Sequence, residues 1–374
     1  MQLSETVKLY PTASQSELIQ AAMTEYIYVV NSLVSDAVNG TSIKKLTTAG
    51  VSANLPSAIV NQCIRDAKSI VRKHYKKCRR AVLKNRKFAD TSEQKVTAPT
   101  LPVLKKPCCY VNNQNFKISG TCIEFPVTLN GKSKRISVKT RISEKQKSIL
   151  ATHKRGLMRI VVKGNSLAAQ IAYSVDEPDA LTDGNVMGVD LGILCPAVSY
   201  CSDGSIRFYG NGRKNKYMRR HYAYLRRKLQ KSKKMSAVKR INDKEQRIMK
   251  DIDHKISHDI IETAVAHNVS VIKLEQLSNI RSTTRTSRKN NHSLHTWPFY
   301  RLAEFIGYKA KLAGITVEYV NPAYTSQTCP VCGNTHHVNG RNYTCRCGFH
   351  AHRDIVGARN ICSSTEYVGN RHIA

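Results

Sequence analysis

The sequence predicts a small all-β domain that carries a helical insertion, followed by an α/β domain. Three observations support this. Short β-branched segments separated by turn signals such as Asn130-Gly131 occupy residues 109–175, which favours an antiparallel barrel or sandwich. Apolar residues recur every three or four positions over 13–38 and 56–88, as in amphipathic helices. From residue 185 onward strands alternate with helices, the order typical of an α/β sheet.

The first half begins with an alternating segment, residues 3–10, that ends at Pro11 and predicts a strand joining the β domain. Residues 89–107 are polar and contain proline, which indicates a linker. We therefore expect a β-barrel domain over 1–12 and 100–184, with the helical insertion at 13–99.

In the second half we expect an α/β domain over 185–374. Its predicted strands are 185–192, 195–202, 205–210, 269–275 and 316–321, and its predicted helical segments are 214–267, 297–313 and a final helix from about 354. The single tryptophan, Trp297, starts an apolar stripe that we interpret as core.

Charge narrows the functional class. The 374 residues include 60 Lys and Arg against 26 Asp and Glu, a net charge of +34. Such an excess of cations repels itself in a compact fold and calls for a polyanionic partner, with nucleic acid preferred over an anionic membrane surface. No apolar stretch is long enough to span a bilayer, and the N-terminus lacks the features of a secretory signal. We expect no membrane partner and a cytoplasmic location, or a nuclear one in a eukaryote.

Acidic residues at the ends of apolar strands point to metal chemistry. Asp190 and Glu275 each end a predicted strand, and Asp354 opens the final helix. Carboxylates converging in this way suit two Mg²⁺ (or Mn²⁺) ions that promote phosphodiester hydrolysis. The order of strands and helices, with acids on the first strand, the fourth strand and the last helix, matches the ribonuclease H-like fold. The alternative is structural, with Asp190 capping a turn, Glu275 pairing with a lysine and Asp354 capping its helix.

Four clustered cysteines predict a zinc ribbon over 324–350. The ligands would be Cys329, Cys332, Cys345 and Cys347, a closed set typical of structural zinc. The second pair is C-x-C rather than C-x-x-C, so His350 or His352 is an alternative fourth ligand. Most of the other eight cysteines are interpreted as small buried hydrophobes.

Three basic segments predict nucleic-acid contacts: 65–87, 213–240 and the loop 281–289. For the loop, a plain solvated segment is the alternative. The candidate contacts are Arg72, Lys73, Lys76, Lys77, Arg219, Arg220, Arg226, Arg227, Lys228, Arg281 and Arg285.

Taken together, these segments resemble the TnpB family of RNA-guided endonucleases from insertion sequences, relatives of type V CRISPR effectors and Fanzor proteins. The resemblance rests on these blocks: KLYPTASQ (8–15), GVDLG (188–192), KLEQLSNI (273–280), WPFYRLAEFIGYKAKLAGI (297–315), PAYTSQTCPVCG (322–333) and HRDIVGARNI (352–361). One departure is Val356, where the family often has asparagine two residues after the last acid.

The resemblance implies a RuvC-like nuclease domain with Asp190, Glu275 and Asp354 as its acids, a β-barrel wedge domain and a helical recognition insertion. It also implies a guide RNA from the transposon end, a double-stranded DNA target beside a short motif, and a prokaryotic, nucleoid-associated protein. The alternatives are a nuclease-dead RNA-guided repressor, a transposase or its DNA-binding accessory protein, a zinc-ribbon transcription factor and a type V CRISPR effector. A transposase would use the pair His350 and His352 with a tyrosine nucleophile.

Overall fold

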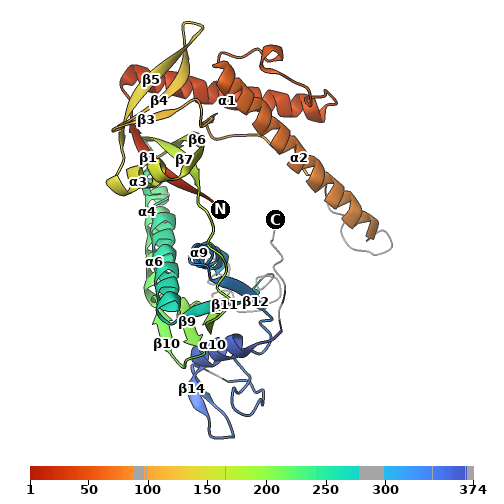
Figure 1. Ribbon diagram of the computed structural model, residues 1–374, viewed down its shortest axis with the longest axis vertical. Helices are drawn as coiled ribbons and strands as arrows, with labels where there is room; N and C mark the ends of the chain where they lie inside the picture. Colours follow the sequence, from red (N-terminus) through yellow and green to blue (C-terminus); the bar gives the residue numbers. More distant parts are fainter. Residues whose placement is uncertain are drawn as a thin grey trace. The chain divides into compact units, whose positions relative to one another are not determined.

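In the computed structural model the chain forms two compact units, unit 1 (Met1–Asp176) and unit 2 (Glu177–Ala374) (Figure 1). The residues described are 1–87, 97, 99–164, 166–241, 243–277, 299–338, 340–366 and 368. The predicted loop contacts Arg281 and Arg285, and Trp297, lie outside these residues.

Unit 1 is built on a seven-stranded antiparallel sheet in the order β2-β6-β7-β1-β5-β4-β3. Its strands are β1 (Gln2–Tyr10), β2 (Cys108–Val111), β3 (Lys117–Ser119), β4 (Cys122–Leu129), β5 (Lys132–Arg141), β6 (Lys154–Lys163) and β7 (Ser166–Ser174). The predicted N-terminal strand β1 lies between β7 and β5. Asn130 and Gly131 both have positive φ, at 51° and 73°, which is the geometry of a two-residue hairpin turn between β4 and β5. The sheet is curled, with β2 and β3 as its two edges, and its closure into a barrel stays a prediction.

Two helices of unit 1 lie within the segment predicted to be a helical insertion. Helix α1 (Ala13–Val38) begins at a capping box in which Thr12 and Gln15 bond reciprocally. After a short 3₁₀ helix (Thr48–Gly50), α2 (Ser57–Lys87) follows. The apolar stripe of each helix is buried in one core with the sheet, where Tyr26 and Cys63 are fully enclosed. A third helix, α3 (Glu144–Thr152), was not predicted.

Unit 2 is built on a five-stranded sheet in the order β10-β9-β8-β11-β12. Its strands are β8 (Asn185–Asp190), β9 (Ala197–Cys201), β10 (Ile206–Tyr209), β11 (Val269–Glu275) and β12 (Thr316–Val320). The strands β8, β11 and β12 are parallel, and β9 and β10 join antiparallel. Its helices are α4 (Gly212–Lys231), α5 (Met235–Ile241), α6 (Lys244–Ala266), α9 (Phe299–Leu312) and α10 (Arg353–Ser363).

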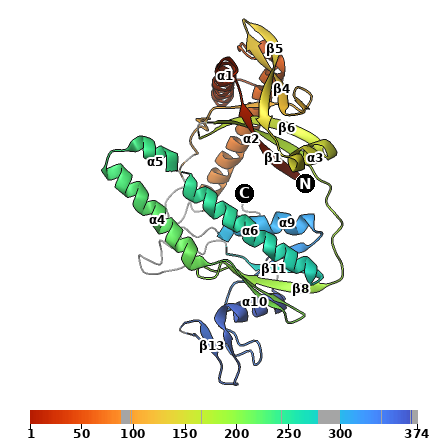
Figure 2. The same ribbon diagram turned by 90° about the vertical axis from the view of Figure 1, so that its left-hand side faces the viewer.

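The two faces of this sheet are covered by different helices. Met187 and Val189 of β8 share a buried core with α6 and α9 (Figure 2). The alternate positions of the strand, Gly188 and Asp190, face the other side of the sheet, where α10 packs. This second face carries the candidate site.

The predicted helical segment 214–267 is three helices rather than one. Helix α4 ends at Lys231 with Ser232 as its C-cap, and Lys233 adopts a left-handed conformation with φ 53°. Because neither glycine nor proline marks this turn, the sequence shows no helix boundary there and a single long helical segment was predicted.

The cysteine-rich segment between β12 and α10 forms a small two-stranded sheet of β13 (Asn342–Thr344) and β14 (His350–His352). Its core consists of Cys329, Tyr343, Cys345 and, from α10, Val356. In the part of the chain that the structure describes, no helix is long and apolar enough to cross a membrane.

Candidate active site and metal centre

The candidate acids on the sheet share the face that α10 covers. Asp190 is the last residue of β8 and Glu275 is the last residue of β11, the neighbouring parallel strand. Parallel strands end at the same edge of a sheet, so both carboxylates lie at one edge. Asp354 comes from the first turn of α10 and is 7% exposed.

Two glycines explain how α10 approaches so closely. A Cβ on Gly188 of β8 would lie 2.2 Å from the carbonyl oxygen of Ala358 and 2.4 Å from the amide nitrogen of Cys362. A Cβ on Gly357 would lie 2.9 Å from Oδ2 of Asp190. All three distances are below 3.0 Å, and the two from Gly188 are to backbone atoms of α10, so a side chain at Gly188 would push the helix away from the strand. The absence of a side chain at Gly357 leaves room for the Asp190 carboxylate.

A lysine fixes the far end of the same helix. Lys273 lies two residues before Glu275 on β11, and its Nζ donates to the carbonyl oxygens of Cys362 at 3.2 Å and Ser364 at 2.7 Å. A cation at the C-terminus of a helix bonds carbonyls that lack a partner within the helix and opposes the helix dipole. The strand bearing Glu275 is thereby bonded to the helix bearing Asp354.

The three acids lie close enough together that two of them affect the ionisation of the third. Burial raises the pKa of Asp190 well above its usual range, and the neighbouring Glu275 and Asp354 raise it further. Burial likewise raises the pKa of Glu275, opposed by a hydrogen bond that Thr325 Oγ1 donates to its carboxylate. Crowded, partly desolvated carboxylates are the donor set expected of a site for hard divalent cations.

One cation in this site, Arg341, was not predicted from the sequence. Nη1 of Arg341 lies 2.5 Å from Oδ1 and 2.6 Å from Oδ2 of Asp354. Arg341 precedes β13, and its carbonyl oxygen accepts from the amide of Arg353 at 2.7 Å, which places it beside the start of α10. No spacing in the sequence marks this arginine, because the contact depends on how the cysteine-rich segment folds back onto the helix.

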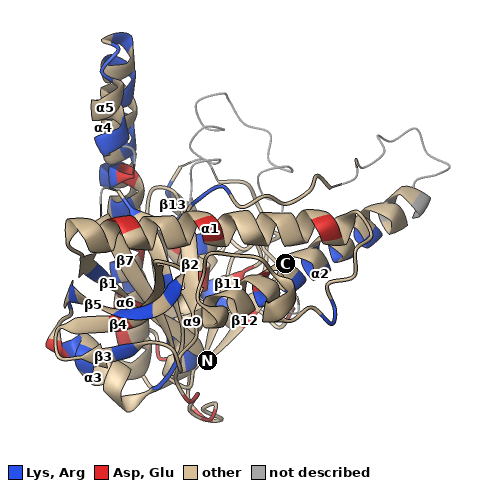
Figure 3. Ribbon diagram, turned by 90° about the horizontal axis from the view of Figure 1, so that it is seen from above, with Lys and Arg blue, Asp and Glu red and all other residues tan. Residues whose placement is uncertain are grey.

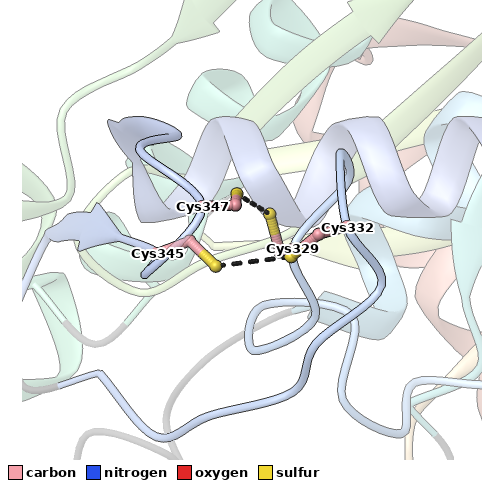
Figure 4. Close-up of side chains that lie close together, drawn as sticks. All are labelled: Cys329, Cys332, Cys345 and Cys347. Carbon is pink, nitrogen blue, oxygen red and sulfur yellow. Dashed lines mark hydrogen bonds between the residues drawn. The ribbon is translucent and has the colours of Figure 1, made fainter.

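The four predicted zinc ligands come together, and Figure 4 shows their side chains converging. Their sulfur atoms lie within 4.8 Å of one another, with Cys329 and Cys347 at 3.7 Å and Cys332 and Cys345 at 3.5 Å. A tetrahedral site with Zn–S bonds of about 2.3 Å has sulfurs roughly 3.8 Å apart, whereas a disulfide bond is about 2.05 Å long. All four cysteines are free, and the arrangement fits zinc.

The two histidines considered as alternative fourth ligands make hydrogen bonds to the backbone instead. His350 Nδ1 lies 3.3 Å from the carbonyl oxygen of Gly348, and His352 Nδ1 accepts from the Asp354 amide as the N-cap of α10. Within the described residues, the cysteines are the group whose ligand atoms meet this metal-site spacing, and the three acids do not meet it.

The predicted nucleic-acid contacts separate into two kinds. Arg72, Lys73, Lys76 and Lys77 on α2, and Arg220, Arg227 and Lys228 on α4, are exposed. Figure 3 shows Lys and Arg along both helices. By contrast, Arg226 pairs with Glu245 of α6 at 2.7 Å, and burial lowers the pKa of Arg219, beside Glu245 and Asp253. These two arginines therefore face the neighbouring helix.

Comparison with known proteins adds family information. The family model described as a Cas12f1-like TNB domain matches residues 299–361, and one described as a probable transposase matches 170–281. The TnpB-like protein MJ0751 of Methanocaldococcus jannaschii is 29% identical over 271 residues, covering 68% of this chain and 95% of that protein. The CRISPR-associated endodeoxyribonuclease Cas12f1 of Sulfoacidibacillus thermotolerans is 27% identical over 216 residues, covering 53% of this chain and 50% of that protein.

Solved structures agree at the level of the fold. Cas12f1 from a complex with guide RNA and target DNA superposes with a TM-score of 0.64 at 15% identity, covering 95% of this chain and 82% of that one. The mini-RNA-guided endonuclease Cas_phi3 gives 0.55 at 12% identity, covering 96% and 92%. The mixed α/β fold, with its curled sheet and its small sheet near the cysteines, is therefore similar to that of the Cas12 effectors.

Proposed function

We propose, from the premise that this chain belongs to the TnpB family, that it is an RNA-guided DNA endonuclease of an insertion sequence. The observation that carries the proposal is the convergence of Asp190, Glu275 and Asp354 on one face of the unit 2 sheet, from β8, β11 and α10. We assign unit 2 as a RuvC-like, ribonuclease H-like nuclease domain, supported by its strand order and by these acids.

The three carboxylates would hold Mg²⁺ or Mn²⁺, which activates a water and stabilises the leaving oxygen when phosphodiester bonds are hydrolysed. The chain's own part is positional. The close contact of α10 with β8 and its bonds to Lys273 keep Asp354 beside the strand carboxylates. Arg341 now balances the Asp354 charge, and its guanidinium would have to share that carboxylate with a cation.

Zinc at the four cysteines would be structural, because four thiolates leave no open position on the metal. Its role would be to fold the segment that brings Arg341 to Asp354. The short strands β13 and β14 enclose few buried side chains, so the metal would supply most of the order of this segment.

The partners proposed are a guide RNA and a matching double-stranded DNA target beside a short motif. Delegating sequence recognition to base pairing suits a chain whose exposed basic helices offer phosphate contacts. Unit 1 would be the wedge domain with its helical recognition insertion.

Two other functions fit the geometry less well. A nuclease-dead repressor would lack at least one of the acids, and all three are present. A transposase would use His350 and His352 as a pair, but the structure engages His352 as the N-cap of α10, and the only tyrosine further along, Tyr367, lies outside the described residues.

The proposal is tested by sequencing the RNA that co-purifies with the protein, then supplying DNA that pairs with its variable end. We expect one defined RNA species, and cleavage of the matching DNA that requires Mg²⁺ or Mn²⁺. A random sample of cellular RNA, or cleavage that ignores the guide, would contradict the proposal.

A further inference from the structure

Helix α4 presents two chemically different faces. Its inner face packs on α6 within the helical hairpin that Figure 2 shows, with Tyr222 buried and Arg226 paired to Glu245 at 2.7 Å. Arg219 is also half-buried on this side. The inner face therefore has a structural explanation, and it accounts for part of the basic charge of the helix.

The outer face has no such explanation. Tyr217 and Tyr224 are 65% and 63% exposed. They lie seven residues apart, two helical turns, and so point to the same side. The cationic residues of this side are also exposed: Arg220, Arg227 and Lys228. The ring of His221 stacks on Tyr217 with centroids 6.1 Å apart and planes 23° from parallel. We call these six residues the tyrosine–cation face.

The alternative explanation is that these residues form an ordinary solvated helix face with no ligand, and two features argue against it. Solvated faces mix charges of both signs, whereas α4 contains no Asp or Glu. Two exposed aromatic rings also lie among these cations, a combination that solubility alone does not require. Cations alone would bind the phosphates of any nucleic acid, so a preference for one form of nucleic acid would have to come from the aromatic rings.

Ring faces discriminate between forms of nucleic acid. Aromatic side chains stack on the faces of unpaired bases, whereas in a duplex those faces are covered by neighbouring base pairs. A positively charged surface with interspersed aromatic rings is therefore matched to a strand whose bases are free. The two tyrosines are about 11 Å apart along the helix axis, a spacing that leaves room for phosphate contacts between them.

We propose that the tyrosine–cation face of α4 binds an unpaired nucleic-acid strand. Tyr217 and Tyr224 stack on bases, and Arg220, Arg227 and Lys228 bind the phosphates between and beside them. The inference rests on the proposed function for its partner class and deepens it by assigning α4 a single strand rather than a duplex. Its test uses binding without divalent metal, so it can fail while cleavage is confirmed, and the reverse.

The first experiment locates the contact. A single-stranded oligonucleotide of about twelve nucleotides containing 5-iodouracil is irradiated with the full-length protein in Mg²⁺-free buffer, and cross-linked peptides are identified by mass spectrometry. RNA and DNA versions of the same sequence show which strand the face prefers. We expect cross-links at Tyr217 or Tyr224. Cross-links found only outside α4 would overturn the proposal.

The second experiment measures what the rings contribute. The Y217L/Y224L variant should bind the single strand at least about tenfold more weakly at roughly 0.3 M salt, where phosphate contacts elsewhere count less, and should bind a duplex of equal length within about twofold of the parent. The matched control, Y217F/Y224F, keeps both rings and should retain single-strand binding. Equal losses for single strand and duplex, no loss in the leucine variant, or the same loss in the phenylalanine variant would each overturn the stacking role.

Discussion

Lys273 offers a quantitative test of how the candidate site is assembled. Its ammonium group bonds two carbonyl oxygens at the end of α10, at 3.2 Å and 2.7 Å. In K273M the side chain keeps its length but loses both bonds. Hydrogen bonds from a charged group contribute about 1.5–3 kcal/mol each when broken, and overlap between the two reduces the sum to about 2–4 kcal/mol.

For a cooperative unit of this size, each kcal/mol lowers the melting temperature by about 2–4 °C, so K273M should melt roughly 5–15 °C below the parent. Thermal unfolding followed by circular dichroism measures this shift. The matched control is K255M, which removes an exposed pair with Asp251 (72% and 61% exposed) and should change the melting temperature by about 1–2 °C at most.

Hydrogen exchange provides a second readout for the same variant. Exchange should accelerate at the last turn of α10 and leave the amides of α6 unchanged, because only the bonds between β11 and α10 are lost. If K273M melts like K255M, or if exchange rises uniformly, Lys273 does not hold α10 against the sheet and the reasoning fails.

Three further predictions concern the same unit. G188A should lower the melting temperature by several degrees or prevent folding, since its Cβ would lie 2.2 Å from the Ala358 carbonyl oxygen. The control G307A, where a Cβ meets nothing within 4 Å, should not lower it, and equal melting of the two variants would contradict the close packing. Because the pKa of Asp190 is raised in the fold, the metal-free protein loses stability as pH rises from the usual carboxyl range through that raised pKa. D190N removes this contribution, so it should be more stable than the parent at pH 8, by about 1.4 kcal/mol for each unit by which the pKa is raised. A melting temperature of D190N below that of the parent at that pH would contradict this. Chelation or C345S should increase exchange in β13 and β14 and release one zinc per chain, while β8 stays protected; metal analysis that finds no zinc would refute the assignment.

Elements with strong local signals were predicted closely from sequence. The strand before Pro11 and helix α1 were predicted to within about two residues, because proline and the Thr12–Gln15 capping box mark that boundary. Helix α3 was missed although Ser143 and Gln146 form the same kind of box, because the β-rich surroundings dominated the pattern.

Features that depend on tertiary contacts were less predictable. The cysteine spacing predicted the four thiols that the structure brings together, and the acids at strand ends predicted the residues of the candidate site, since each of these patterns is local. The inward orientation of Arg226 on α4 required knowing that α6 lies beside it with Glu245. Arg341 required knowing that the cysteine-rich segment returns to Asp354. The charge of a basic helix alone does not show which of its residues face solvent and which face a neighbouring helix.

The most direct test of the central claim is guide-dependent DNA cleavage by the purified protein–RNA complex, comparing the parent with D190N and D251N. Asp251 is an exposed acid of α6 paired only with Lys255 in the described structure, so D251N controls for the loss of one negative charge. We expect that D190N reduces the cleavage rate by at least about 10³-fold while binding of guide and target persists, and that D251N cleaves at the parental rate. Parental cleavage by D190N would contradict the assignment of Asp190, Glu275 and Asp354 as the nuclease site.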